Sequence, residues 1–240
     1  MRVWDIHPGY LNGKSLLGEH RELHGVVSIL GHGRQGYSNH PESKRWKQRG
    51  WALRQRHRLL AAEMAFRGYH DRTPVRTRSA AGEWPVTFID SPGRQFALLA
   101  EKYRDKQPGR IPLPRTSHEL WSHHKYSVMA RSQAAYRELG RRVSGLRGRE
   151  SFDDLALELV SWLRRPPRPG DFRNAIEHMQ GYLQSDASQN DDDGCGSALT
   201  RVQDLVRFEG EAFLITQTAL TDLAAWPGAG CVVSVPCRSR

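Results

Sequence analysis

The chain has 240 residues, a formal net charge of +10 at pH 7 and a hydrophobic fraction of 38%. That fraction is enough for a packed core, while no apolar run approaches the length needed to cross a membrane. The first residues lack the basic-then-apolar pattern of a secretion signal, and an odd count of three cysteines argues against a disulfide framework. We therefore expect a soluble, cytoplasmic protein rather than a membrane or secreted one.

The positive charge is concentrated in residues 1–182, which hold 32 Lys and Arg against 18 Asp and Glu, whereas residues 183–240 hold 4 against 8. Arginine dominates the basic part, and its planar guanidinium binds phosphate through two parallel hydrogen bonds. The preference of GC-rich genomes for Arg explains the choice of Arg over Lys better than it explains the excess of charge. Nucleic acid is thus favoured as the partner over an anionic membrane surface, which predicts a nucleoid-associated location.

The first four residues, Met1-Arg2-Val3-Trp4, are mostly apolar and aromatic, so we expect the amino end to be built into the fold. An α-amino group has an unperturbed pKa of about 7.7–8, whereas that of a Lys side chain is near 10.4. Part of the α-amine is therefore neutral at physiological pH. A neutral amine beside a carboxylate can attack a carbon that is able to become an imine.

Apolar residues recur at helical spacing between about Lys14 and Leu30 and predict the first helix. At about 100° per residue, Glu22 lies at the edge of the apolar stripe and Arg21 points outward. Glu22 is then partly desolvated, which suits either an acid/base group or an ordinary salt bridge on the helix face. His20 and His24 have a spacing that can hold a metal, but no third ligand is identifiable, so we predict no metal site.

A second, long helix is predicted from Ser43 to Arg67, with Gly68 as its stop. Within it, Glu63 is expected to pair with Arg67 at the i, i+4 spacing, and His57 suits packing at least as well as catalysis. Prolines then break the chain into a loop-rich segment, which contains a short helix near Phe96 to Tyr103.

The opening residues, the triplet Arg21-Glu22-Leu23 and the run Glu63-Met64-Ala65-Phe66-Arg67-Gly68-Tyr69 together resemble the pyrimidine-dimer DNA glycosylase family, the endonuclease V type of phage and bacteria. The resemblance covers roughly the first half of the chain. It implies a bifunctional DNA glycosylase and abasic-site (AP) lyase that excises UV-induced pyrimidine dimers without a metal or organic cofactor.

The resemblance assigns the nucleophile to the first residue of the mature chain, here the α-amino group of Met1, and the acid/base role to the carboxylate of Glu22. Phage members of the family expose a small residue after loss of the initiator Met. Position 2 is Arg in this chain, a large side chain that protects the initiator from removal, so we expect Met1 to be retained. The distance in sequence from the amine to Glu22 then equals that in the processed phage enzyme.

The resemblance also implies that Arg2 and Arg21 bind the phosphates around the lesion, which offsets the energetic cost of base extrusion. Without the resemblance, Arg2 and Arg21 would be interpreted as solvated surface charges. Two family positions differ here, because Gly25 and Val26 occupy the place of a family arginine and Ser15 that of a histidine.

The motifs from Trp121 to Arg131 and from Asn174 to Tyr182 resemble the YbgA-like (DUF1722) family of unknown function, over about residues 117–183. The aromatic and basic cluster from Trp121 to Tyr126 suits base stacking, but a helix face in the core is the favoured interpretation. After a polar, acidic stretch, Ser197 to Trp226 is predicted as one helix with a gap at Gly210.

The sequence therefore predicts a mainly α protein. A compact helical bundle of the endonuclease V type is expected over residues 1–116, a YbgA/DUF1722-like helical unit over 117–183, and an acidic linker and C-terminal tail over 184–240. Damaged double-stranded DNA is the expected partner, and no membrane is expected. Two alternatives remain, namely a non-catalytic nucleic-acid-binding protein on the same fold and a glycosylase for another damaged base.

Overall fold

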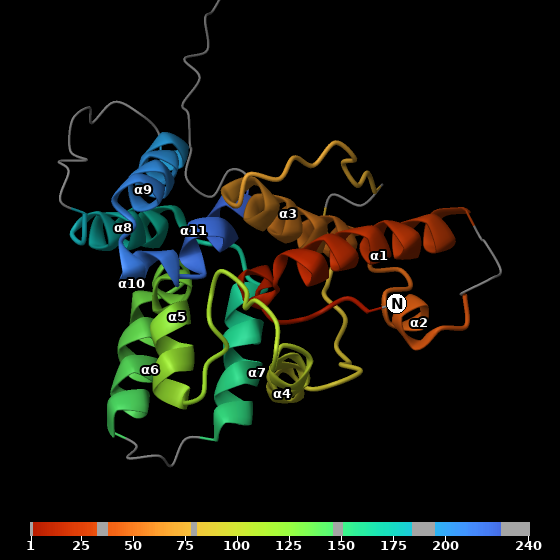
Figure 1. Cartoon of the computed structure of the whole chain (residues 1–240), viewed down its shortest axis with the longest axis horizontal. Helices are drawn as coiled ribbons and strands as arrows, with labels where there is room; N and C mark the ends of the chain where they lie inside the picture. Colours follow the sequence, from red (N-terminus) through yellow and green to blue (C-terminus); the bar gives the residue numbers. More distant parts are fainter. Residues whose placement is uncertain (1, 33–37, 78–80, 146–150, 184–194, 227–240) are drawn as a thin grey trace, which may run out of the picture.

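The computed structural model describes residues 2–32, 38–77, 81–145, 151–183 and 195–226. Within these ranges the regular structure is helical and contains no strand, which confirms the predicted mainly α class (Figure 1). None of the described helices combines the length and the apolar character that spanning a bilayer requires.

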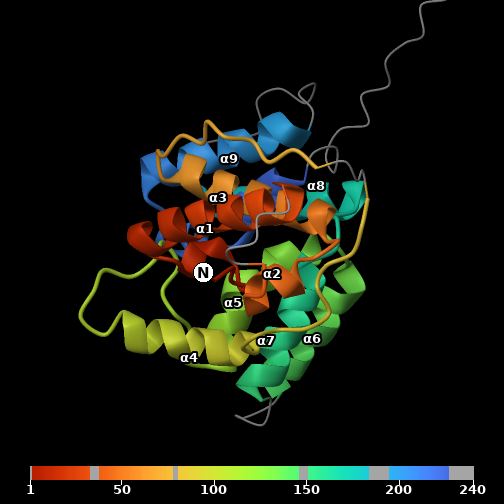
Figure 2. The same cartoon turned by 90° about the vertical axis from the view of Figure 1, so that its right-hand side faces the viewer.

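The helices of the first half are the short 3-10 turn η1 (Pro8–Tyr10), α1 (Gly13–His32), α2 (Pro41–Arg45), α3 (Gly50–Phe66) and α4 (Pro92–Lys102). The second half contains α5 (Ser117–Met129), α6 (Gln133–Gly145), α7 (Phe152–Leu163), α8 (Pro169–Gln180), α9 (Cys195–Glu209), α10 (Ala212–Ile215), α11 (Ala219–Asp222) and η2 (Leu223–Ala225). Helices α1 and α3 lie side by side, α4 lies against α7, and α5 packs on both α6 and α7 (Figures 1 and 2).

Polar side chains cap the N-termini of several of these helices by accepting hydrogen bonds from backbone N–H groups of the first turn. The side chain of Asn12 accepts from the backbone N–H of Ser15 at the start of α1. Ser91 does the same for α4, so this helix begins four residues earlier than the short helix predicted from Phe96. Such caps satisfy backbone donors that have no partner within the helix.

The prediction of one helix from Ser43 to Arg67 is wrong, because the chain leaves the helical path between α2 and α3. Gln48 there adopts a positive φ of 62°. Trp46 is buried, and its indole N–H donates to Oε2 of Glu42 at 3.0 Å. Arg45 also binds the distant Asp5 at 2.9 Å. Tertiary contacts of this kind can override the helical propensity of a segment. The predicted stop at Gly68 is confirmed, since this glycine has a φ of 80°.

The single helix predicted from Ser197 to Trp226 is also wrong beyond Gly210, where the expected break occurs with a φ of 67°. After α10 the chain breaks again, because the backbone N–H of Thr218 donates at 2.9 Å to the carbonyl of His123 in α5 rather than to its own helix. The predicted acidic linker and the end of the tail lie mostly outside the described residues.

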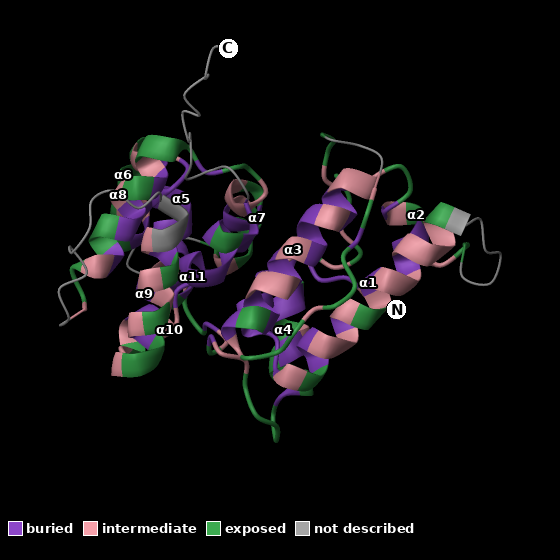
Figure 3. Ribbon diagram, turned by 90° about the horizontal axis from the view of Figure 1, so that it is seen from above, coloured by how far each residue is buried: buried purple, intermediate pink, exposed green. Residues whose placement is uncertain are grey.

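The core consists of two clusters of buried side chains that both draw on α3 and α5. The first runs from Val3 to Val160, and the second runs from Leu59 to Trp226. Buried residues line the faces that the helices turn toward one another (Figure 3). The segments on either side of residue 117 therefore share their cores, while the division into domains stays a prediction.

Glu63 is the centre of a buried ionic network between α3, the connection before α5, and α11. Its carboxylate lies 2.7 Å from the guanidinium groups of both Arg67 and Arg110, which confirms the predicted pair with Arg67. It also accepts a hydrogen bond of 2.7 Å from the hydroxyl of Thr221. Burial alone would raise the pKa of Glu63, but Arg110 and Arg67 outweigh it and hold the pKa well below its ordinary value.

We predict that Glu63→Gln lowers the free energy of unfolding by about 3–5 kcal/mol at pH 7, because it leaves Arg110 buried without its carboxylate. The control Glu83→Gln removes an ion pair with Arg49 whose carboxylate side chain is 78% exposed, and should cost less than about 1 kcal/mol. Denaturant unfolding measures both.

The ionised Glu63 has a depressed pKa in the folded state, so its contribution is fully present above the unfolded value near 4.5 and is lost as the pH falls below it. The difference between wild type and Glu63→Gln should therefore shrink at pH 3. An equal difference at pH 7 and pH 3 would contradict the assignment of an ionised Glu63.

Candidate active site

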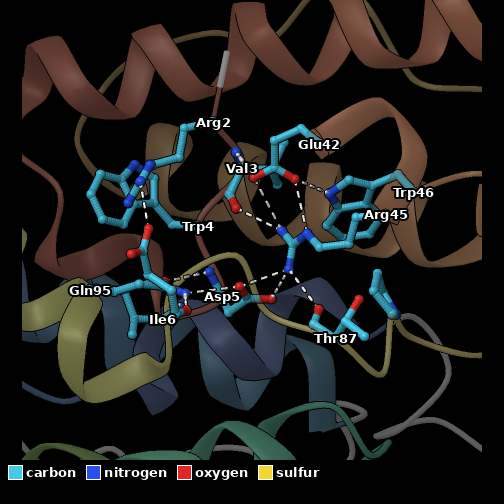
Figure 4. Close-up of polar contacts among 12 residues, drawn as sticks. Arg2, Val3, Trp4, Asp5, Ile6, Glu42, Arg45, Trp46, Thr87 and Gln95 are labelled. Carbon is cyan, nitrogen blue, oxygen red and sulfur yellow. Dashed lines mark hydrogen bonds and ion pairs between the residues drawn. The ribbon is translucent and has the colours of Figure 1, made fainter. Parts of the chain in front are cut away.

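The backbone that follows Met1 is held by side chains from three different helices, and Figure 4 shows the contacts of two of them, Glu42 and Gln95. The N–H of Val3 donates to Glu42 at 3.0 Å, the N–H of Trp4 donates to Glu19 at 3.1 Å, and the N–H of Asp5 donates to Gln95 at 2.8 Å. Residues 2–7, the N-terminal segment, lie outside any helix or strand. Three of their backbone donors are thus satisfied by side chains of α2, α1 and α4. Met1 itself lies outside the described residues.

Arg45 of α2 binds the same segment from the other side (Figure 4). Its guanidinium lies 2.9 Å from the carboxylate of Asp5 and donates at 2.9 Å to the carbonyl of Val3. Glu42 supplies a second carboxylate to it, also at 2.9 Å. The side chains of all three ionic partners are almost completely buried, so each charge depends on the others for compensation.

Glu19 connects α1 to the N-terminal segment and to α3. Arg56 binds both of its carboxylate oxygens, at 2.8 and 2.9 Å, and also donates to the carbonyl of Ile6 at 2.8 Å. Burial raises the pKa of Glu19 from its ordinary value, and Arg56 and the N–H of Trp4 oppose that shift. The sequence patterns do not indicate this positioning role, although the spacing of three residues places Glu19 on the same helix face as Glu22.

Two of the predicted site residues, Arg2 and Glu22, line one hollow with a volume of about 440 Å³. The complete lining is Arg2, Trp4, Lys14, Ser15, Gly18, Glu19, Glu22, Leu98 and Lys102. Glu22 is half-buried, as its place at the edge of the apolar stripe predicts. Arg2, the first residue that the structure describes, therefore shares this hollow with Glu22.

Arg2 is held within the hollow by two contacts. Its guanidinium lies 2.6 Å from a carboxylate oxygen of Asp90 and 4.8 Å from the ring centroid of Trp4. The side chain still exposes 38% of its surface. Arg2 is therefore oriented by Asp90 and Trp4 and remains partly exposed.

Arg21 is exposed, as predicted, and lines a neighbouring hollow of about 830 Å³ instead. The two hollows share Lys14, Ser15 and Lys102 in their walls, so Arg2 and Arg21 belong to adjacent parts of one concave surface. Ser15, which replaces a family histidine, lies where the two meet.

Lys14, Lys102 and Lys106 add positive charge to this concave surface, and the sequence patterns assign no role to them. Burial lowers the pKa of Lys102, and the nearby charges of Lys106 and Arg2 lower it further. Lys14 and Lys102 thus both contribute side-chain amines to the hollow of Glu22. Only the packing of α4 against the N-terminal segment brings Lys102 there, so the linear sequence carries no signal for it.

Two further predictions concern histidines. His123 and His124 lie in the core, with ring nitrogens 3.2 and 3.3 Å from the hydroxyl of Tyr10, which confirms the interpretation of that cluster as a core helix face. By contrast, the statement that His20 and His24 have no third ligand is wrong, because the fold brings other ligand groups to them.

Comparisons with known proteins agree with both resemblances. Residues 1–77 match the family model described as pyrimidine dimer DNA glycosylase, and residues 125–205 match that of a protein family of unknown function, DUF1722. Comparison with curated proteins and with solved structures gave no match. Each family match covers less than half of the chain. The N-terminal part of this protein, which supplies Arg2, Arg21 and Glu22, is therefore similar to pyrimidine dimer DNA glycosylases, and the later part to DUF1722 proteins.

Proposed function

We propose that this protein is a DNA repair enzyme, a bifunctional glycosylase and AP lyase that excises UV-induced pyrimidine dimers from double-stranded DNA. The observation that carries the proposal is the hollow that Arg2 and Glu22 share. The similarity of residues 1–77 to pyrimidine dimer DNA glycosylases supports the same reaction.

In the proposed reaction, the neutral α-amino group of Met1 attacks C1′ of the damaged nucleotide. The electrons of the N-glycosidic bond leave with the base, which takes up a proton, while the attacking nitrogen loses one. Opening of the sugar ring gives an imine between Met1 and C1′. This covalent step divides one difficult bond cleavage into easier ones.

Glu22 is proposed to move the protons of this reaction. Its carboxylate removes a hydrogen from C2′, which the imine has made acidic, and β-elimination then expels the 3′ phosphate oxygen and cuts the strand. Water hydrolyses the imine and regenerates the amine. Acid/base assistance of this kind contributes about 10²–10⁴-fold to a rate.

The basic residues of the concave surface are proposed to bind the DNA backbone. Lys14, Arg21 and Lys106 flank the hollow in which Arg2 is held, and the whole chain carries a net charge of +10. Contacts with the phosphates offset the few kcal/mol that extrusion of a nucleotide costs.

Trapping with borohydride tests which amine forms the imine. On UV-irradiated and abasic DNA, we expect a covalent adduct that maps to the N-terminal peptide. Acetylation of the α-amine or an N-terminal tag should abolish both the adduct and strand incision, whereas Lys102→Arg should keep the adduct on the same peptide. An adduct on Lys102 with a free Met1 would overturn the assignment of the nucleophile.

The same experiment separates the alternative functions. No adduct with any substrate would indicate a non-catalytic binding protein. An adduct on abasic DNA, together with incision of oxidised or alkylated but not UV-irradiated duplexes, would indicate a glycosylase for another damaged base.

Glu22→Gln should reduce strand cleavage by at least about 10²-fold and leave DNA affinity unchanged, since only proton transfer is lost. Single-turnover cleavage and equilibrium binding measure the two effects. The matched control is Glu138→Gln, which removes an exposed carboxylate of α6 and should cleave normally. A Glu22→Gln protein with wild-type cleavage would exclude the acid/base role.

The double variant Lys14→Gln, Lys106→Gln should bind duplex DNA more weakly. The slope of log K against log salt should fall by about 0.9 for each phosphate that the variant no longer neutralises. Arg173→Gln, an exposed change on α8, is the control and should leave the slope unaltered. Equal slopes for all three proteins would place the DNA elsewhere on the surface.

A further inference from the structure

Four potential metal ligands converge on the side of α1 that faces α3. His20 and His24 come from α1, His57 comes from α3, and Asp71 follows the turn at Gly68. One ligand atom from each of the four side chains lies within 4.8 Å of the corresponding atoms of the other three. Only His20 and His24 are close together in the sequence. The fold brings His57 and Asp71 to them.

The spacing of these atoms matches the coordination shell of a metal ion. Nε2 of His20 lies 3.2 Å from Nε2 of His57 and 3.3 Å from Oδ1 of Asp71, and Nε2 of His57 lies 3.4 Å from Oδ2 of Asp71. In a tetrahedral zinc site with bonds of about 2.0–2.1 Å, neighbouring ligand atoms are about 3.3 Å apart. The distances between the ligand atoms of these three side chains are therefore close to those around a bound ion.

Asp71 is held in position by its own neighbours. The backbone N–H of Thr73 donates to Oδ1 of Asp71 at 2.9 Å, and the hydroxyl of Thr73 donates to the same oxygen at 3.2 Å. Burial would raise the pKa of Asp71, but these bonds and the nearby His57 lower it overall, so the carboxylate is ionised. The hydroxyl of Thr73 also lies 3.1 Å from Nε2 of His24. Such outer partners orient the ligands of metal sites.

We propose that His20, His24, His57 and Asp71 form a site for a divalent transition metal of the zinc type. Three imidazoles and one carboxylate suit zinc, cobalt or nickel, whereas magnesium and calcium prefer oxygen ligands alone. Four protein ligands fill a tetrahedral shell and leave no open position for a reacting water, which is the pattern of structural sites. The ion ties α1 to α3 and to the segment that contains Asp71.

The metal site is separate from the proposed glycosylase chemistry. None of its four ligands lines the hollow of Arg2 and Glu22. It nevertheless acts on the same helix, because α1 carries Glu22 and Arg21 as well as His20 and His24. Metal binding therefore stabilises the helix that presents the candidate catalytic carboxylate.

Titration of the full-length, chelator-treated protein with Zn²⁺ and Co²⁺ tests the proposal directly. We expect one ion per chain, visible absorption bands of tetrahedral cobalt, and a higher melting temperature with Zn²⁺ than without it. These readouts need neither a variant nor DNA, so they are independent of glycosylase activity. Absence of stoichiometric binding by the wild-type protein would overturn the proposal.

Variants then assign the ligands. His24→Gln and His57→Gln should each weaken Zn²⁺ binding by more than about 100-fold, since loss of even an outer partner costs about 10–100-fold. The matched control is His70→Gln, which removes an exposed histidine next to Asp71 and should bind as the wild type does. Unchanged affinity in both ligand variants, or an equal loss in His70→Gln, would contradict the assigned site. His24 is only half-buried, so its variant tests the site even if His57→Gln fails to fold.

Discussion

The geometry of the candidate active site depends on how the N-terminal segment is held. Buried carboxylates of Glu42 and Glu19 accept its backbone N–H groups, and Arg45 and Arg56 bind its carbonyls while compensating the same carboxylates. Burying a carboxylate without its arginine would destabilise the fold, and so would burying a backbone N–H group without an acceptor. The same ion pairs and hydrogen bonds avoid both penalties. The segment that begins with Arg2, near a chain end of the kind that would ordinarily fray, is thereby fixed beside the hollow that contains Glu22.

Helix α1 serves this arrangement with two of its faces. Glu19 and Glu22, three residues apart, line the hollow, with Glu19 bound by Arg56. His20 and His24, four residues apart, lie toward α3 and Asp71. A shift of α1 along its axis or a rotation about it would disturb both sets at once. Glu19 contacts α3 through Arg56, and the histidines contact it through His57, so stabilising the packing of α1 on α3 also maintains the position of Glu22.

The sequence predicts features that depend on local pattern and fails where long-range contacts decide. Gly68 ends a helix as predicted, because only a residue tolerant of positive φ suits the turn. The break at Gln48 has no signal in the local pattern, and the residues before it make long-range contacts such as that of Arg45 with Asp5. Likewise, His57 joins the histidines of α1 only through the packing register of two helices. The family resemblance identified Glu22 as a candidate residue. The lysines around it could be identified only from the structure.

The two parts of the chain that resemble different families contact each other beside the N-terminal segment. The N-terminal match ends at residue 77, yet α4 supplies Gln95 and Lys102 to the segment and the hollow. Helix α4 in turn packs on α7 of the DUF1722-like part, where the rings of Phe96 and Phe152 lie 5.6 Å apart. Arg164, just after α7, also pairs with Asp5 at 2.7 Å. The DUF1722-like part therefore contacts the N-terminal segment directly, through Arg164 and Asp5, and also packs on the helix that supplies Gln95 and Lys102.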